Sequence, residues 1–412
     1  MATIVQSSAA PAGTLSALRY PNFRLYFFGQ LVSVSGSWMQ IVAQGWLVFY
    51  LTKDELWLGL VACAAGLPSL LLSPIAGVLV DRLPRRNVLI FTQAAQMVLA
   101  LILSWLTFTN TVQVWHIMVL AFLLGVVNAI DAPARQAIIA DLVGTDQLSS
   151  GIAMNSIIFN LSRVFGPAAA GIVLNRFGPA LCFFVNGISF LAVIGTLFVI
   201  HLNNVQRTTG ELEPLRRLKE GLQFARRSPT IWPLLWLAVV AAFFTSNLTT
   251  LLPAFADTVL HSPKEAYSAI TTAIGLGAVV AGLALAPLGR RFGHGNVVIG
   301  MVFFVMISAF LTSRTNVPGL AIFLGSLYGF AIILQFVTVN TLIQRHVPDA
   351  FRGRVMSLYT LTWFGIAPFG ALLMGAIAAQ VGAADAIMIA ALLGGVVSIG
   401  ILLRSPQLRQ LA

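Results

Sequence analysis

Residues 77–86 read Gly77-Val-Leu-Val-Asp81-Arg82-Leu-Pro84-Arg85-Arg86 and lie between two long apolar runs. The chain has only 13 acidic residues, so an aspartate grouped with three arginines at this place is unusual. In a polytopic membrane protein such a stretch is a short loop, because charged side chains avoid the hydrocarbon that the flanking apolar runs cross. The stretch therefore predicts the end of one membrane span and the start of the next.

The composition of the whole chain agrees with a membrane protein. Of its 412 residues, 58% are hydrophobic and only 9% are charged, and the mean hydropathy is +0.90. A soluble domain carries about 25% charged residues. The net charge of +11 could indicate a nucleic-acid binder, but the basic residues sit in short loops between apolar runs and not in one patch. We therefore expect a polytopic membrane protein without a nucleic-acid partner.

Apolar segments that are long enough to cross a bilayer recur twelve times along the chain. They lie at 23–50, 56–80, 87–109, 113–141, 149–175, 179–201, 230–256, 267–289, 295–313, 318–345, 353–379 and 384–404. Such lengths suit helices, and the alternating strands of about ten residues that build membrane barrels are not seen. We predict an all-α polytopic membrane protein with twelve transmembrane helices.

The basic residues predict the orientation of these spans. Of the 24 basic residues, 18 fall on the side of both termini, and Arg135 and Arg163 fall within spans. The four on the opposite side are Lys53, Arg176, Lys264 and Arg314. Because positively charged loops stay in the cytoplasm, we expect both termini there and the protein in the cell inner membrane.

Correspondences about 200 residues apart indicate two similar halves. The matching pairs are Gly77 with Gly282, Arg85-Arg86 with Arg290-Arg291, Pro21 with Pro229, and Pro167 with Pro368. The second copy of the opening stretch loses its acid, since Ala286 stands where Asp81 stands in the first. We expect two pseudo-symmetric bundles of six helices.

These halves predict the division of the chain. The expected segments are a cytoplasmic segment (1–22), an N-terminal six-helix bundle (23–201), a cytoplasmic linker (202–229), a C-terminal six-helix bundle (230–404) and a cytoplasmic tail (405–412). In the linker, one helical face carries Leu215, Leu218, Leu222 and Ala225. This pattern favours an amphipathic helix on an anionic inner leaflet, and a plain polar linker is the alternative.

The chain resembles the major facilitator superfamily of transporters over nearly all of its length. Its opening stretch resembles the family's loop motif Gly-x-x-x-Asp-Arg/Lys-x-Gly-Arg/Lys-Arg/Lys through Gly77, Asp81, Arg82, Arg85 and Arg86, with Pro84 in place of the usual glycine. The run Arg163-Val-Phe-Gly166-Pro167-Ala-Ala-Ala-Gly171 resembles the Gly-Pro motif of exporters, which are typically proton-coupled antiporters of drugs or metabolites. The branch that contains the enterobactin exporter and macrolide efflux proteins is similar in Asn22-Phe-Arg24, Gly29-Gln30, Trp38-Met39-Gln40 and Asp131-Ala-Pro133-Ala-Arg135-Gln136.

The charged loop predicts two contacts on the inner side. Asp81 ends span two where span eleven is expected to begin, near Gly353, and a carboxylate at that positive helix end is favoured by about 0.3–1 kcal/mol. Arg85 or Arg86 is expected to pair with Asp141 at the inner end of span four. Together these contacts would latch the halves while the cavity faces outward. In the alternative, the arginines serve only the topology.

Span five is expected to act as a gate. Pro167 removes one helix donor and bends the span, and Gly166 and Gly171 permit tight packing, as Gly77 does in span two. Ordinary use of glycine and proline in membrane helices is the alternative.

Arg163 is a charge near the middle of span five, which is costly unless it is paired or hydrated. Spans four and five form a hairpin that turns near Thr145, so Asp131 and Arg163 differ in depth by about four residues, or roughly 6 Å. We predict that these two residues interact, with Arg135, one turn from Asp131, as a competitor. Protonation of Asp131 would then free Arg163 for an anionic substrate, and a fixed ion pair is the alternative.

Polar residues within spans are candidates for a substrate cavity between the halves. The candidates are Gln40, Gln44, Asn155, Asn160, Asn247, Gln335, Asn340 and Trp363. For each of them, packing inside the bundle is the more common role. Asp257, at the outer end of span seven, is either an outer gate or a solvated loop acid.

Signatures of other functions are absent from the sequence. The five histidines lie in separate segments, Cys63 and Cys182 lie within apolar runs, and no GxSxG, P-loop or dinucleotide motif occurs. We expect no enzyme, metal or cofactor, and without a P-loop an ion gradient is the expected drive. The prediction is a monomeric proton antiporter that exports small amphipathic molecules, such as drugs or siderophores, by alternating access. A lipid or lysolipid flippase with a side opening to the bilayer, or a non-transporting scaffold, is the alternative.

Overall fold

A computed structural model describes residues 16–200, 214–245 and 247–411, and every regular element in these ranges is a helix. The elements are η1 (Ser16–Arg19), α1 (Pro21–Thr52), α2 (Glu55–Arg82), α3 (Arg85–Phe108), α4 (Val114–Val143), η2 (Thr145–Gln147), α5 (Leu148–Phe177), α6 (Pro179–Val199), α7 (Pro214–Arg227), α8 (Ile231–Val240), η3 (Ala241–Thr245), α9 (Leu248–Thr258), α10 (Glu265–Phe292), α11 (His294–Arg314), α12 (Pro318–His346), α13 (Asp349–Leu361), η4 (Thr362–Ile366), α14 (Ala367–Val381), α15 (Ala383–Leu403) and η5 (Pro406–Gln410).

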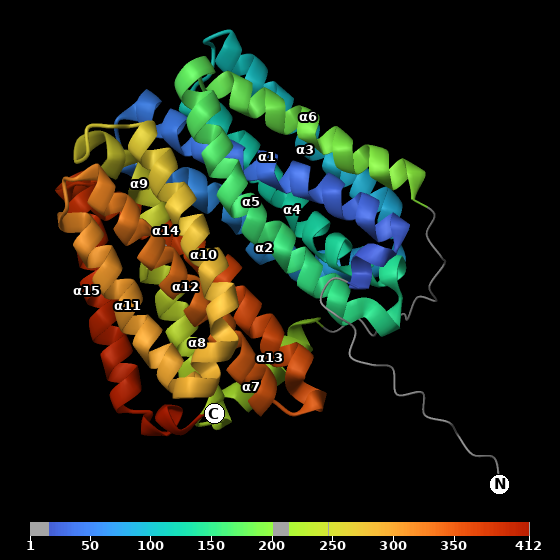
Figure 1. Cartoon of the computed structure of the whole chain (residues 1–412), viewed down its shortest axis with the longest axis vertical. Helices are drawn as coiled ribbons and strands as arrows, with labels where there is room; N and C mark the ends of the chain where they lie inside the picture. The colour runs from blue at the N-terminus through green and yellow to red at the C-terminus, as the bar shows by residue number, and fades with distance from the viewer. Residues whose placement is uncertain (1–15, 201–213, 246, 412) are drawn as a thin grey trace.

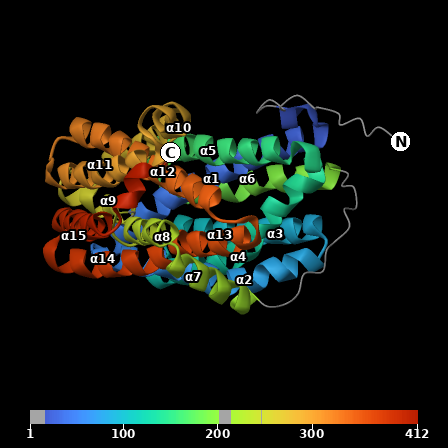
Figure 2. The same cartoon turned by 90° about the horizontal axis from the view of Figure 1, so that it is seen from below.

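The long helices form two groups. Figure 1 shows α1 to α6 packed together on one side of the molecule and α8 to α15 on the other, and Figure 2 shows the same two groups from below. Helices α2 and α14 pack against each other across the boundary, and so do α5 and α10. We call the end of the molecule that holds η1, α7 and η5 the termini side, and the opposite end the far side.

Local signals begin and end these helices. Asp54 caps α2, because its carboxylate accepts a hydrogen bond from the backbone N–H of Leu56 at 2.9 Å. Gly178 and Gly382 make the turns from α5 to α6 and from α14 to α15 with φ of 83° and 87°, a conformation that favours glycine. The matching turns sit at matching places in the two groups, as expected of pseudo-symmetric halves.

Ten helical stretches among the described residues are long and apolar enough to cross a membrane. The other two predicted spans are less apolar in sequence or less regular in structure. Helix α1 is 32 residues long but carries polar side chains such as Gln30, Gln40 and Gln44 along its length. In the eleventh predicted span, the purely apolar part is the 15-residue helix α14.

Two predicted spans contain a π-helical segment, which the sequence pattern did not indicate. The segment η3 lies between α8 and α9 within predicted span seven, and η4 lies between α13 and α14 within predicted span eleven. Helix α13 also begins at Asp349, four residues before the predicted start at 353. The prediction was late because Asp349 to Arg352 is a polar turn that an apolar count leaves out.

The linker contains the predicted helix as α7, but this helix packs on protein. The rings of Phe224 and Phe351 of α13 stack with centroids 4.5 Å apart, and Glu220 forms an ion pair of 3.0 Å with Arg354 of α13. Ala225, on the predicted apolar face, is fully buried. We expected α7 to lie flat on a lipid leaflet, but its main packing partner is the first turns of α13.

Candidate functional site

The far side is closed between the two groups of helices. The ammonium of Lys53 at the end of α1 lies 2.8 Å from the carboxylate of Asp257 on α9. The ammonium of Lys264 lies 4.9 Å from the ring centroid of Trp46 on α1. Asp257 is thus a contact between the halves, which favours the outer-gate interpretation over a solvated loop acid.

Small residues let the helix backbones approach closely on the same side. A β-carbon on Gly59 of α2 would lie 2.5 Å from the backbone oxygen of Ala371 on α14. A β-carbon on Gly171 of α5 would lie 2.8 Å from the hydroxyl of Ser268 on α10. Real β-carbons do not come so near to other atoms, so these crossings require glycine.

The termini side is open at the corresponding places. A β-carbon on Gly77, Gly282 or Gly353 would meet no heavy atom within 4 Å. The close helix approach that we predicted at Gly77 is therefore not made in this conformation. The reason is that no described atom of another helix lies within 4 Å of this face of α2.

The opening stretch lies at the turn from α2 to α3 on the open side. Helix α2 ends at Arg82, whose residue is exposed, and α3 begins at Arg85. The side chain of Asp81 lies outside the described part of the chain, so its predicted contact with the start of α13 stays a prediction. Pro84 is the N-cap of α3 in an extended conformation, with ψ of 109°.

One predicted contact of this stretch is present. A guanidinium nitrogen of Arg85 lies 2.7 Å from the carboxylate of Asp141 and donates a second bond to the backbone oxygen of Ala137. Arg86 instead donates to the backbone oxygen of Phe198 on α6. The Arg85–Asp141 pair joins α3 to α4 within the first half, so it supports the loop and does not itself bridge the halves.

A buried polar network surrounds Asp131 in the first half. One carboxylate oxygen of Asp131 accepts hydrogen bonds from Thr92 at 2.7 Å and from Gln93 at 2.9 Å, both on α3. The other oxygen lies 2.8 Å from Nε of Arg135, one turn along α4. The side chain of Asp131 is 1% exposed and that of Arg135 is 21% exposed. Asp131 is therefore a buried charge with good partners on two helices.

The predicted pair of Asp131 and Arg163 is wrong. Asp131 pairs with Arg135, and Arg163 stacks over the ring of Trp38 on α1, with its guanidinium carbon 5.1 Å from the ring centroid. The depth estimate was one-dimensional and ignored the rotation of each helix about its axis. Residues four apart share a helix face, so Arg135 reaches Asp131 without help from tertiary packing.

Gly166 and Gly171 of the span-five motif make the close packing that was predicted, and the predicted bend at Pro167 stays a prediction. A β-carbon on Gly166 would overlap the backbone of Ser35 and the side chain of Trp38, both on α1. Pro167 is buried and lies inside the continuous helix α5, which runs from Leu148 to Phe177. Gly166 and Gly171 thus place α5 in close contact with α1 on one face and with α10 on another.

Several candidate cavity residues have partners inside their own half. The amide of Asn186 on α6 donates to Gln40 at 2.6 Å, so Gln40 faces α6 and its assignment to the cavity is wrong. The amides of Asn160 and Asn247 donate to backbone oxygens of their own helices, at Ser156 and Phe243. The physical reason is that a buried amide stays paired, and the nearest partner is usually in the same bundle.

The other candidates for the substrate cavity differ in how far their side chains are buried. Gln335 is buried, Asn340 accepts from Gln344 at 2.5 Å, and Gln44 and Asn155 are half-buried. Trp363, within the π segment η4, packs edge-on to Phe336 with ring centroids 5.1 Å apart. These residues stay candidates for substrate contact.

Sequence reasoning missed the polar residues that hold Asp131. Thr92 and Gln93 lie within an apolar span and donate hydrogen bonds to its carboxylate. Their signal was available, since polar residues that recur in a buried span need partners. Which helix supplies those partners could not be read from spacing along the chain.

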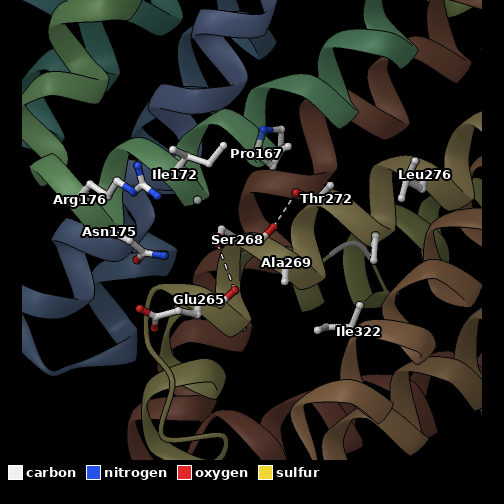
Figure 3. A pocket seen from close by; sticks show the side chains of 13 residues that line it. Pro167, Ile172, Asn175, Arg176, Glu265, Ser268, Ala269, Thr272, Leu276 and Ile322 are labelled. Atoms are coloured by element: carbon white, nitrogen blue, oxygen red, sulfur yellow. Dashed lines mark hydrogen bonds between the residues drawn. The ribbon is translucent and has the colours of Figure 1, made fainter.

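A groove of about 700 Å³ lies between α5 and α10. Its wall is mostly apolar and includes Pro167 and Gly171 of the span-five motif. Figure 3 shows Asn175, Arg176 and Glu265 near one another at one end of the groove and Leu276 at the other end. The wall of the groove is thus mostly apolar, with polar and charged groups at its far-side end.

Comparisons with known proteins cover almost the whole chain. A family model described as transmembrane secretion effector, of the MFS group, matches residues 12–411. The staphyloferrin A transporter of Staphylococcus aureus is 25% identical over 85% of this chain and 88% of that protein. Macrolide efflux protein A of Streptococcus pyogenes is 22% identical over 88% and 92% of the two chains. In fold, a bacterial homologue of the iron transporter ferroportin in its inward-facing state is similar, with a TM-score of 0.67, 17% identity and coverage of 92% and 98%.

Proposed function

Because the chain belongs to the major facilitator superfamily, in the family of transmembrane secretion effectors, we propose that it exports small amphipathic molecules across the inner membrane. The protein is a membrane transporter and not an enzyme. The proposed export is driven by protons that move inward as substrate moves outward, and both termini are cytoplasmic. The protein acts as a monomer in this proposal.

The names of similar proteins support this proposal. One relative is named as a transporter of staphyloferrin A, and another is named for macrolide efflux, which supports the outward direction. Siderophores and macrolides are both too polar or too large to cross a bilayer freely, yet both carry apolar surface. A transporter of this family with an apolar groove and few central charges suits such amphipathic molecules.

The observation that carries alternating access is the asymmetry between the two sides. On the far side, Lys53 and Asp257 join the halves and Gly59 packs against the backbone of α14. On the termini side, Gly77 and Gly353 face open space. With the termini in the cytoplasm, this is the state that takes up cytoplasmic substrate, and rocking of the halves about their centre would produce the other state.

Asp131 is the proposed proton carrier. The charged and titratable groups around it are Arg135 on its own helix and Tyr26 on α1, and α3 contributes only the neutral Thr92 and Gln93. Protonation would remove the attraction that holds Arg135 and weaken the two hydrogen bonds from α3, because a neutral carboxyl is a poorer acceptor than a carboxylate. Weaker hydrogen bonds from Thr92 and Gln93 would loosen α4 against α3 and so bias the halves toward one state.

The experiment is transport into inverted membrane vesicles with an imposed pH gradient. The substrate panel contains a macrolide, a catecholate siderophore and a fluorescent lysophospholipid. We expect gradient-driven uptake of the macrolide or siderophore by the wild type, and uptake that no longer responds to the gradient in Asp131→Asn. The matched control is Asp385→Asn, which removes an exposed acid that pairs with Arg314 at 2.7 Å on the far side. Full gradient response in Asp131→Asn would rule out the proton role.

The groove supports a second candidate function, the flipping of a lipid or lysolipid. It lies between α5 and α10, and its wall includes Ile172 and Leu276, which are exposed to the surroundings of the bundle. Arg176 and Glu265 at one end could take the phosphate and the amine of a zwitterionic headgroup. In the vesicle panel, transport of the lysophospholipid alone would favour this function over drug or siderophore export.

A further inference from the structure

Arg163 is the surplus charge at the centre of the protein. Among the described residues of the membrane-crossing helices, only Asp131, Arg135 and Arg163 carry a charge eight or more residues from both ends of their helix. Asp131 and Arg135 neutralise each other through their ion pair of 2.8 Å. One positive charge is therefore left over, and it belongs to Arg163.

The side chain of Arg163 points away from the lipid. Each residue turns an α-helix by about 100°, so Phe165 and Ile172 lie on roughly the opposite face of α5. These two side chains are 55% and 61% exposed on the outside of the bundle. Arg163 instead lies over the ring of Trp38 on α1, and its buried Nε has no hydrogen-bond partner.

The same residue lies at the boundary between the halves. A β-carbon on Gly275 of α10 would overlap the backbone carbonyl of Arg163. Transporters of this architecture bind substrate near midplane, between halves and beside broken helices. Arg163 occupies such a boundary, where α5 packs on α10 of the other half.

We propose that Arg163 and Trp38 form a binding site for the carboxylate of an amphipathic organic acid. This inference rests on the proposed function and names the class of substrate. A half-buried cation within a membrane span is costly without an anion, and a guanidinium binds a carboxylate through two parallel hydrogen bonds. One carboxylate balances the one surplus charge, and the ring of Trp38 offers a flat apolar surface to the adjoining part of the ligand.

The test compares two probes of the same shape, 2-naphthoate and the neutral 2-naphthamide, by calorimetry on the purified full-length protein. We expect the wild type to bind 2-naphthoate at least about tenfold more tightly, as a hydrogen-bonded charge pair implies. Arg163→Gln should remove this preference, and Arg163→Lys should keep part of it, because an ammonium lacks the two-pronged geometry. The control Arg314→Gln removes a far-side arginine and should bind both probes as the wild type does.

Stability provides a second readout that does not depend on the probe. Replacing an arginine that has a hidden acidic partner lowers the thermal unfolding temperature, whereas replacing an unpaired buried cation does not. We expect Arg163→Met to unfold at the same or a higher temperature than the wild type without ligand. A clear decrease would mean that Arg163 is already neutralised, and would overturn the proposal.

The outcomes also separate this inference from the proposed function. Equal affinity for the two probes in the wild type, unchanged preference in Arg163→Gln, or displacement of 2-naphthoate by chloride alone would overturn the carboxylate site. Gradient-driven uptake of a neutral macrolide without any preference for 2-naphthoate would overturn this site and leave export intact. Preference for 2-naphthoate that depends on Arg163, without uptake of any panel member, would support the site and contradict export.

Discussion

At the scale of single residues, Asp131 and Arg163 show how a membrane protein handles a buried charge. Asp131 has its ion pair and two hydrogen bonds, so its charge is retained at a tolerable cost. Arg163 has the face of Trp38, which is a weaker partner for a cation than a carboxylate is. Among the described residues, the first charge has a partner of opposite sign and the second has none.

The completeness of the Asp131 site leads to a prediction about Arg135. Arg135→Ala leaves a buried carboxylate without its cation, and removal of one member of a buried pair costs about 3–5 kcal/mol. We expect a lower thermal unfolding temperature for this variant in detergent. The double variant Asp131→Asn with Arg135→Gln removes both charges and should recover most of the loss. A double variant as unstable as Arg135→Ala would show that the pair contributes nothing.

At the scale of helices, the glycines of α2 and α5 decide how tightly the halves close. The crossings of α2 with α14 and of α5 with α10 have no room for a β-carbon at Gly59 and Gly171. The π segments η3 and η4 lie in the second half, on the helices of spans seven and eleven. Wide π turns often mark functional places in a helix, and here they sit in spans that must move.

The packing of α2 on α14 predicts the effect of a single methyl group. Gly59→Ala would bring a β-carbon to 2.5 Å from the backbone oxygen of Ala371, and overpacking of this kind costs about 1–3 kcal/mol. We expect a shift toward the state that is open on the far side. Spin labels at Leu51 and Thr258 should then report a larger share of long distances. Gly195→Ala is the control, because a β-carbon there meets no atom within 4 Å.

At the scale of the whole molecule, the two halves touch on one side and part on the other. Lys53 and Asp257 belong to different halves, whereas the similar pair Arg314 and Asp385 belongs to the second half alone. Both pairs lie on the far side with oxygen and nitrogen atoms 2.7–2.8 Å apart. The main difference is that the Lys53–Asp257 pair bridges the two halves and the Arg314–Asp385 pair does not.

This difference predicts the outcome of cross-linking. In a background without the native cysteines, Lys53→Cys with Asp257→Cys should be joined by a short bifunctional thiol reagent, and transport in vesicles should then stop. Arg314→Cys with Asp385→Cys should also be joined, but with transport retained. Full transport with the first pair joined would mean that the far side does not open during the cycle.

Much of the architecture was predictable from the sequence. Long apolar runs, the charges at their ends, and matching residues about 200 positions apart predict an all-helical transporter with two similar halves. The contact of Arg85 with Asp141 was predictable as well, because both residues sit at neighbouring helix ends on one side. Helix boundaries were accurate to a few residues except where a polar turn begins α13.

The site was harder to predict. Gln40 looked like a cavity residue and faces Asn186, and Asp131 looked like the partner of Arg163 and binds Arg135. Both predictions failed because the sequence did not give the direction in which each side chain points around its helix axis. The sequence shows which residues need a partner but not which neighbouring helix supplies it.

The sequence by itself thus determined that the chain crosses a membrane many times, in two related halves, with three charges far from the ends of its spans. Hydropathy is a local property of the chain, so the composition of one apolar run is enough to predict that it crosses a bilayer as a helix. Only the tertiary structure decided that Arg163 is the unpaired charge and that the far side is closed. Those facts depend on how packed helices are rotated and which backbones meet, and both are set by side chains far apart in the sequence.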